Sequence, residues 1–358
     1  MNTGVPRGKL HSASQRCHEG RTLGTSAKGI VLALVLSLAA FALTNRYSRA
    51  ESSIFDPAGP RAARIADLWW VMFGLGVAVF SVIMMLLVIA LVRGRRRTGA
   101  VLQDNDNGTR PILIGVLLSA VIMIGVFGYT LWTTRSLAGP TAAADLTIEV
   151  AGNQWWWEVR YPDDDVVTAN ELHIPVGVPV TVKLTSDNVI HSFWVPRLTD
   201  KMDLIPGRTN ELWFQADEAG TYLGECAEFC GIQHALMQFR VIAEPRDDFV
   251  AWLDTQRDAA SAPVPDTLRE AGQQIFLSSA CVACHTVRGT NASGTVGPDL
   301  THLASRQTLA AGTLDNTIGN LTAWIVDPQA IKPGTIMPAT DFDPEDLQAL
   351  VAYLLSLH

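Results

Sequence analysis

Four side chains that bind soft metals lie within twelve residues of one another. Cys226, Cys230, His234 and Met237 are spaced C-x3-C-x3-H-x2-M, and His191 lies on an earlier predicted strand. Thiolate, imidazole and thioether together suit copper better than magnesium or calcium. One Cys with two His and a weak Met would hold a single copper ion. A second Cys lets two bridging thiolates hold a pair of copper ions, each with one His, and such a pair suits electron transfer.

Two other interpretations of this cluster stay open on spacing alone. Cys226 and Cys230 could form a disulfide in an oxidising compartment, which would leave His234 and Met237 without a role. Alternatively, the two Cys and two His could hold a structural zinc ion, although a Met ligand weakens that interpretation.

A second cluster lies nearer the C-terminus. Cys281, Cys284 and His285 form a C-x-x-C-H motif, which is typical of covalent haem c attachment. The two thiols would bond the haem vinyl groups, and His285 would bind the iron. A reduced, thioredoxin-like C-x-x-C pair is less favoured, because the segment is predicted to lie in an oxidising compartment.

The iron needs a sixth ligand, for which we predict Met337, the only Met after the C-x-x-C-H motif. Methionine ligation raises the potential of a haem relative to ligation by two histidines. The alternatives are His302, predicted to be a surface or hydrogen-bonding residue, and His358, predicted to be a solvated terminal residue. With its Gly297-Pro-Asp-Leu300 segment, the region 265–358 resembles a class I cytochrome c.

The elements that position these groups begin with apolar stretches near the N-terminus. Residues 68–92 and 111–132 each exceed 20 residues without a charge, so we predict two membrane helices, forming a hairpin over 60–135. Aromatic residues stand at their outer ends: Trp69, Trp70, Tyr129 and Trp132. Five arginines lie between the stretches: Arg93, Arg95, Arg96, Arg97 and Arg110. The positive-inside rule therefore places the residues after 133 outside the membrane.

Residues 1–50 are predicted to be a signal peptide or leader. A basic stretch precedes an apolar run at 29–43, which is short for the ~30 Å hydrocarbon core of a bilayer. A short third membrane helix is the alternative. Cys17, in the basic stretch, is assigned no role.

Beyond residue 135 the pattern predicts two external domains. Short alternating runs punctuated by Gly, Pro, Asn and Asp indicate an antiparallel β-barrel or sandwich over 144–245. These runs are 146–151, 155–161, 179–185, 190–195, 209–214, 220–224 and 238–242. A small-residue segment with prolines, 258–266, is predicted to be a linker. Helical periodicity then predicts an all-α domain over 267–358, with helices at 267–278, 320–326 and 344–357.

Composition and charge exclude several classes of protein. The chain has 358 residues, of which 48% are hydrophobic and 17% are charged, so overall disorder is not expected. Residues 1–135 carry a formal charge of +9 (15 Lys and Arg, 6 Asp and Glu), and residues 136–358 carry −17 (12 against 29). An acidic exterior argues against nucleic acid and favours a basic protein partner.

The copper-binding segment 226–237 closely resembles the dinuclear copper loop of cytochrome c oxidase subunit II. Three upstream segments match as well: His191-Ser-Phe-Trp, Ile205-Pro-Gly-Arg208 and Gln154-Trp155-Trp156-Trp157. The resemblance covers about 60–245 and implies a cupredoxin-like barrel whose CuA centre accepts electrons from cytochrome c. The copper ligands that it implies are His191, Cys226, Cys230, His234, Met237 and the backbone carbonyl of Glu228.

The resemblance implies three further roles. The Glu228 side chain would bind magnesium or manganese at the interface with subunit I, and Asp203 would help through water. Trp155 matches the aromatic residue through which electrons enter, although a strand tryptophan can also simply fill a core. Ala227 stands where Ser is usual, and Trp156 where Tyr is usual; neither is a ligand.

The family also commonly has a Glu at a proton inlet just before the second membrane helix. This chain has none there, and Asp104 and Asp106 are the nearest carboxylates. A role in proton delivery is therefore not predicted for this chain.

Together these features predict subunit II of a caa-type cytochrome c oxidase, a multi-pass protein of the bacterial plasma membrane with both external domains on the periplasmic side. Electrons would pass from cytochrome c or a quinol-oxidising complex to haem c, then to CuA. From there they would reach the haem-copper site of subunit I, which reduces oxygen to water and pumps protons. One alternative is the electron-input subunit of a CuA-containing nitric oxide reductase. Another is a membrane-tethered electron carrier or copper-handling protein.

Overall fold

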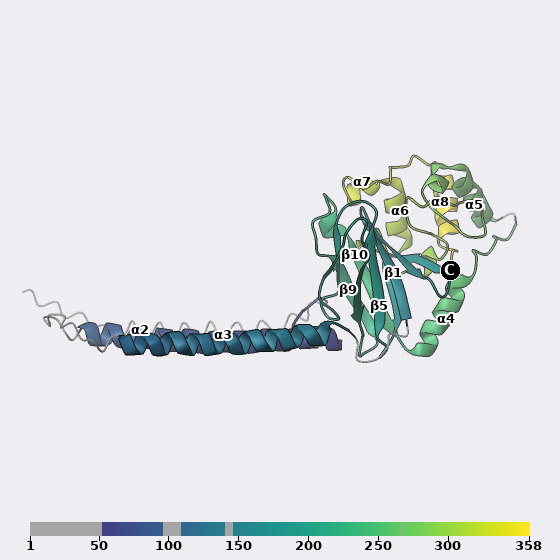
Figure 1. Ribbon diagram of the computed structural model, residues 1–358. Coiled ribbons are helices and arrows are strands. Elements are labelled where there is room, and N and C mark those ends of the chain that lie inside the picture. The colour runs from purple at the N-terminus through teal and green to yellow at the C-terminus, as the bar shows by residue number, and fades with distance from the viewer. Residues whose placement is uncertain (1–51, 96–108, 140–145, 266) are drawn as a thin grey trace, which may run out of the picture. The chain divides into compact units, whose positions relative to one another are not determined.

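The computed structural model describes residues 52–95, 109–139, 146–265 and 267–358 (Figure 1). The predicted leader, including Cys17, lies outside the described residues, as do Asp104 and Asp106. Those expectations therefore stay predictions.

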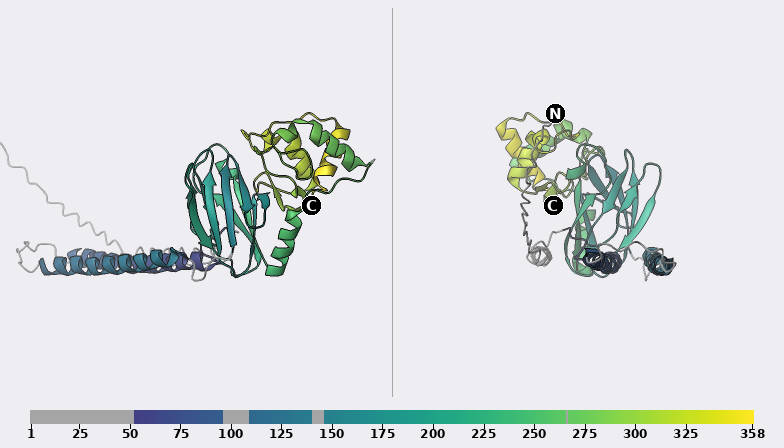
Figure 2. Two further views of the ribbon diagram at one scale, coloured as in Figure 1. Left: turned by 45° about the vertical axis from the view of Figure 1, so that its right-hand side comes forward. Right: turned by 90° about the vertical axis from the view of Figure 1, so that its left-hand side faces the viewer.

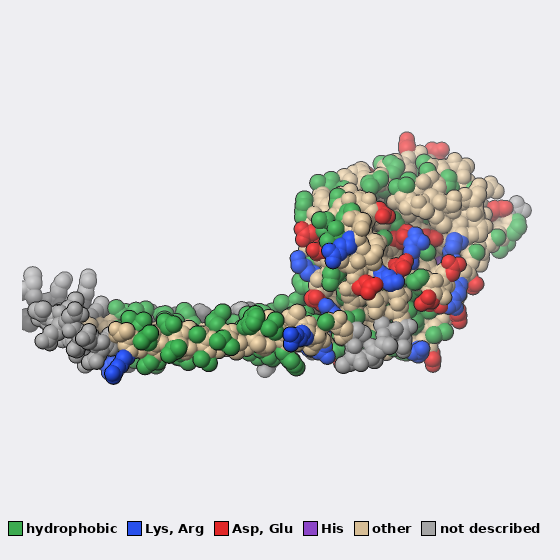
Figure 3. Space-filling view, in the orientation of Figure 1, with side chains coloured by type: hydrophobic (Ala, Val, Ile, Leu, Met, Phe, Trp, Pro, Cys, Tyr) green, Lys and Arg blue, Asp and Glu red, His purple; other side chains and the backbone are tan. Residues whose placement is uncertain are grey.

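Two long helices precede the external part of the chain. Helix α2 spans Pro60–Arg95 and helix α3 spans Thr109–Leu137, and both are long and apolar enough to cross a membrane. Their apolar side chains are exposed along most of their length (Figure 3). Because such a surface is unfavourable in water, it fits a lipid environment.

The outer ends of these helices are tied to the β-structure that follows. The guanidinium of Arg61 pairs with the Asp200 carboxylate and donates to the carbonyl of Leu137 over 2.8 Å. The indole of Trp213 donates to the same carbonyl over 3.1 Å. These contacts join the start of α2 and the end of α3 to the β-structure.

That β-structure is a sandwich of two five-stranded sheets (Figure 2). The first sheet has the order β3-β2-β1-β5-β8, with strands at Val166–Ala169, Trp156–Tyr161, Leu146–Asn153, Val180–Ser186 and Asn210–Phe214. The second has the order β4-β10-β9-β6-β7, with strands at Glu171–Pro175, Gln238–Glu244, Gly220–Cys226, His191–Trp194 and Met202–Leu204. The pairs β1–β5 and β10–β4 are parallel, and the other pairings are antiparallel.

The core lies between the sheets and explains why the strands alternate. Every second residue of β5 is buried, as the period of two requires. Trp157, Phe193 and Phe239 form an aromatic centre, with ring centroids of Phe239 at 5.1 Å from Trp157 and 4.5 Å from Phe193. This centre belongs to the same buried cluster as Cys226, Cys230 and Met237.

The expected sandwich is present, but three of its strands were not predicted. Strands β3, β4 and β7 have three to five residues each, too few for alternation to stand out. Helix α4, Arg246–Arg257, was also not predicted; it buries Phe249 and Leu253. Its mixed polar sequence carries only a narrow apolar stripe.

The C-terminal part is helical. Helices α5 (Leu268–Ser278), α6 (Ile318–Val326), α7 (Pro328–Ile331) and α8 (Pro344–Leu354) surround a core of their own. Short 3-10 turns lie at Ala280–Ala283 and Leu303–Ser305. A hairpin pairs two strands of two residues each, β11 (Thr308–Leu309) and β12 (Leu314–Asp315). Helices α5 and α8 approach closely because Gly272 has no side chain: a Cβ there would lie 2.0 Å from the Ala349 carbonyl oxygen.

Candidate metal centre and haem site

The topology brings the metal-binding side chains together. Cys226 ends β9, and Gln238 begins β10, so Cys230, His234 and Met237 lie in the connection between two paired strands. His191 begins β6, which pairs with β9. This connection, residues 227–237, is called the copper loop below.

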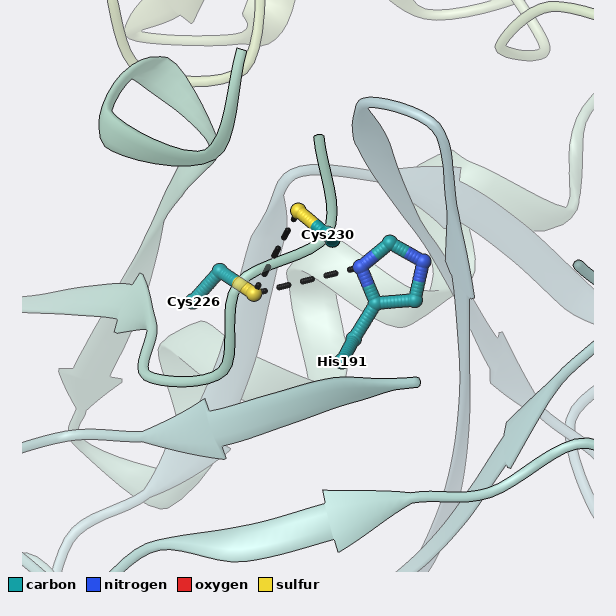
Figure 4. A group of neighbouring side chains, drawn as sticks. All are labelled: His191, Cys226 and Cys230. Carbon is teal, nitrogen blue, oxygen red and sulfur yellow. Dashed lines mark hydrogen bonds between the residues drawn. The ribbon is translucent and has the colours of Figure 1, made fainter. Parts of the chain in front are cut away.

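Each cysteine sulfur has its own histidine. Sγ of Cys226 lies 3.9 Å from Nδ1 of His191, and Sγ of Cys230 lies 3.8 Å from Nδ1 of His234. The two sulfurs are 3.8 Å apart. Figure 4 shows His191, Cys226 and Cys230 pointing toward one another. Their ligand atoms lie within 4.8 Å of one another, a spacing that could hold a metal ion.

Each sulfur also has a third, weaker donor beside it. The carbonyl oxygen of Glu228 lies 3.2 Å from Sγ of Cys226, and the thioether sulfur of Met237 lies 3.8 Å from Sγ of Cys230. The six expected ligands therefore divide into two sets, one around each thiol.

This donor set fits a pair of copper ions better than the alternatives. Both cysteines are free and buried, and their sulfurs are well beyond the ~2.05 Å of a disulfide bond. Six donors, including a thioether and a carbonyl, exceed the four N and S ligands of structural zinc. The two thiolates lie between two sets of donors, each with one imidazole and one weak donor. This arrangement provides ligands for two soft metal ions.

The pKa values of the two thiols also favour a bound cation. The hydrogen bond from Cys230 holds the pKa of the Cys226 thiol well below its ordinary value. The same contact and burial raise the pKa of Cys230. One proton thus leaves readily, whereas a second negative sulfur so close to the first needs a metal charge to stabilise it.

His191 is oriented by residues that the sequence pattern did not single out. Its Nε2 lies 3.0 Å from Oδ1 of Asn188, which leaves Nδ1 facing the sulfurs. Gly152 makes room for the imidazole, because a Cβ there would lie 2.9 Å from Cδ2 of His191. An Asn three residues before a His is too common a pattern to have revealed this role.

Trp155 is partly buried; it packs against the sandwich core and also contacts the copper loop. Its indole N–H donates to the carbonyl of Cys230 over 3.0 Å, and the amide of Gln154 donates to the same carbonyl over 2.8 Å. Gly231, with φ of +118°, permits this approach, because a Cβ there would lie 3.0 Å from Cζ2 of Trp155. The indole is therefore one hydrogen bond from a predicted copper ligand.

The expected magnesium residues do not gather in the same way. Glu228 and Asp203 are both partly exposed. Among the described residues, neither belongs to a group of three or more His, Cys or carboxylate side chains close enough to hold a metal. The magnesium or manganese site stays a prediction that rests on the resemblance.

The C-x-x-C-H motif follows α5 and folds as a 3-10 turn that Ser279 caps through its hydroxyl. The thiols of Cys281 and Cys284 are free and partly exposed. Nδ1 of His285 donates to the carbonyl of Pro298 over 2.8 Å, which leaves Nε2 for a ligand. Burial lowers the pKa of His285, so the ring is neutral, as an iron ligand must be. These features fit a covalently attached haem.

The three candidates for the sixth iron ligand lie in different environments. Met337 is partly exposed, and its carbonyl accepts from the amide of Gln329 over 3.1 Å. His302 is buried, with Nε2 3.1 Å from the carbonyl of Asp258, so it has the hydrogen-bonding role expected of it. His358 is exposed. Met337 stays the predicted ligand.

Comparisons with known proteins agree with this division of the chain. A family model described as "Cytochrome C oxidase subunit II, periplasmic domain" matches residues 165–244, and a model described as "Cytochrome c" matches residues 269–358. The periplasmic domain of the oxidase subunit II of Bradyrhizobium japonicum is 34% identical, covering 33% of this chain and 97% of its own, with a TM-score of 0.32.

Full-length relatives show similarity over most of the chain. Cytochrome c oxidase subunit 2 of Alkalihalophilus pseudofirmus is 35% identical over 90% of this chain and 96% of its own length. The subunit of the same name from Bacillus sp. PS3 is 34% identical over 68% of this chain and 73% of its own. The predicted fold class, a cupredoxin-like sandwich followed by a helical cytochrome c domain, is thus confirmed. This chain belongs to the cytochrome c oxidase subunit II family.

Proposed function

We propose that this chain is the electron-input subunit of a caa-type cytochrome c oxidase. It would take electrons from cytochrome c or a quinol-oxidising complex and deliver them toward subunit I, where oxygen is reduced to water and protons are translocated. The observation that carries the proposal is the division of six donors into two sets around two free thiols.

In this proposal the side chains have distinct roles. The pair of copper ions would be held by Cys226, Cys230, His191, His234, Met237 and the Glu228 carbonyl. The haem would be held by Cys281, Cys284, His285 and Met337. When bound, the copper pair and the haem each accept and release one electron at a time. The aromatic core and the paired strands keep the ligands fixed, so little reorganisation accompanies each transfer.

The location follows from the helices and the matched domain. Helices α2 and α3 would cross the plasma membrane as a hairpin, and the external domains would lie on the periplasmic side. The formal charge of −17 over residues 136–358 would attract a basic donor and speed its association.

The test is to purify the complex through a tag on this chain. We expect two copper ions and one covalent haem per chain, a near-infrared mixed-valence band, and oxygen uptake with reduced cytochrome c. Zinc or a cystine at the copper loop, with no near-infrared band, would overturn the proposal. Consumption of nitric oxide in place of oxygen would assign the chain to the reductase alternative.

A further inference from the structure

The copper loop is in direct contact with the cytochrome part of the chain. The backbone N–H of Gln238 donates to the carbonyl of Ala311 over 3.0 Å, and the hydroxyl of Thr313 lies 3.3 Å from the carbonyl of Leu236. The Gln233 amide donates to the carbonyl of Pro333. Two cytochrome segments, residues 310–313 and 332–334, thus touch one face of the loop; they are called the docking segments below.

Lys332 lies at the centre of this contact. Only 2% of its surface is exposed, although an ammonium is rarely buried without a carboxylate partner. Its Nζ donates to three backbone carbonyls: Leu236 at 2.8 Å, Ala310 at 3.0 Å and Trp155 at 3.3 Å. An ammonium has three N–H donors, so these three carbonyls satisfy it completely.

The three carbonyls belong to three different parts of the molecule. Leu236 lies in the copper loop, between His234 and Met237. Trp155 immediately precedes β2 and contacts Cys230. Ala310 lies in a docking segment. Lys332 itself is five residues before the predicted haem ligand Met337. One charged group therefore joins the segment 332–337, called the predicted haem-ligand segment below, to the copper loop.

The docking segments are shaped for this contact. Ala310 and Ala311 have φ of +53° and +57°, a conformation that costs energy for residues with a Cβ and persists only where the surroundings hold it. Gly312 follows with φ of +76°, and a Cβ there would lie 2.9 Å from Cβ of Gln238. A Cβ at Gly334 would lie 1.9 Å from Cδ1 of Ile232. The packing at Gly312 and Gly334 is too close for a transient contact between the docking segments and the copper-binding domain.

A second contact lies away from the copper loop. The buried carboxylate of Glu171, in β4, accepts from the backbone N–H of Gln307 at 3.1 Å and of Thr308 at 2.8 Å. The Thr308 hydroxyl donates to it over 3.0 Å. Two buried polar contacts, one at Lys332 and one at Glu171, resist rotation about either one.

We propose that Lys332 is a positioning residue that docks the predicted haem-ligand segment on the copper loop, so that the two electron carriers form one rigid unit. This inference rests on the proposed function. Electron transfer would then occur at a fixed separation. A flexible linker alone would instead leave the haem domain tethered and searching for the copper site.

The test compares Lys332→Met with the wild type in the purified complex containing both cofactors. A photoreductant injects one electron, and absorbance follows its movement from haem to copper in buffer and in glycerol. A docked pair transfers at a rate independent of viscosity, whereas a searching domain slows as viscosity rises. We expect Lys332→Met to transfer roughly tenfold more slowly and to become viscosity-dependent, because positioning is lost. Its copper and haem spectra should stay unchanged, which a damaged copper site would not allow.

The matched control is Lys183→Met, which removes a lysine from β5 and should behave as the wild type. A wild-type rate without viscosity dependence in Lys332→Met would overturn the inference. If that variant does not assemble, Glu171→Leu removes the acceptor of all three hydrogen bonds of the second contact, and viscosity-independent transfer there would overturn the inference equally. Absence of the near-infrared band in the wild type would instead defeat the proposed function.

Discussion

The indole N–H of Trp155 donates a hydrogen bond to the backbone carbonyl of Cys230 over 3.0 Å. A residue predicted to admit electrons is thus joined to a predicted copper ligand through one hydrogen bond. The same indole packs over Gly231, whose positive φ no other residue adopts easily.

Replacement of Trp155 by Phe should slow electron input. The variant keeps an aromatic ring but loses the N–H that fixes it, and a loss of roughly 1.4 kcal/mol in positioning corresponds to about tenfold in rate. Stopped-flow reduction of the copper centre by cytochrome c measures it. The control is Trp156→Phe, one residue along; equal slowing in both variants would show that Trp155 has no special role.

Replacement of Met237 by Leu should alter the copper centre without unfolding the domain. Met237 is fully buried, and a swap of similar volume costs less than about 1.5 kcal/mol. We expect the near-infrared band to shift and turnover to fall roughly tenfold, while the complex still assembles. Met202→Leu, a similar change on β7, should leave the band unmoved. Normal turnover in Met237→Leu would count against its role as a ligand.

Replacement of Gly297 by Ala should disturb the haem iron. A Cβ there would lie 2.7 Å from Cε1 of His285, and overpacking of this kind costs typically 1–3 kcal/mol. The ring must shift, so we expect the haem to stay covalently attached but with an altered absorption spectrum. Gly319→Ala is the control, because nothing lies within 4 Å of its Cβ position. Identical haem spectra in both variants would contradict this placement of His285.

Lys332 should make stability depend on pH. Burial lowers its pKa from 10.5 to about 8, so between these values the unfolded chain binds more protons than the folded chain. Unfolding free energy therefore rises with pH across this window, by up to about 3 kcal/mol. Thermal unfolding followed by haem absorbance should show the wild type gaining stability from pH 8 to 10.5 relative to Lys332→Met. If the stabilities of the two proteins change with pH in parallel, Lys332 is not a buried ammonium in the folded chain.

Much of this molecule can be predicted from the sequence because the signals are local. Membrane helices need about 20 apolar residues, haem attachment needs two thiols and an imidazole within five residues, and residues 226–237 hold four of the predicted copper ligands. Each pattern is set by chemistry between near neighbours. The family and the order of its domains follow from such patterns.

The tertiary structure decided what depends on residues distant in sequence. Sγ of Cys226 lies 3.9 Å from Nδ1 of His191, 35 residues earlier, only because β6 pairs with β9, and Trp155 reaches Cys230 only because the sheets face each other. A lysine in a polar, glycine-containing segment gives no sign that it is buried. Lys332 donates to three carbonyls from parts of the chain up to 177 residues away. Only the folded arrangement of both domains brings those carbonyls together.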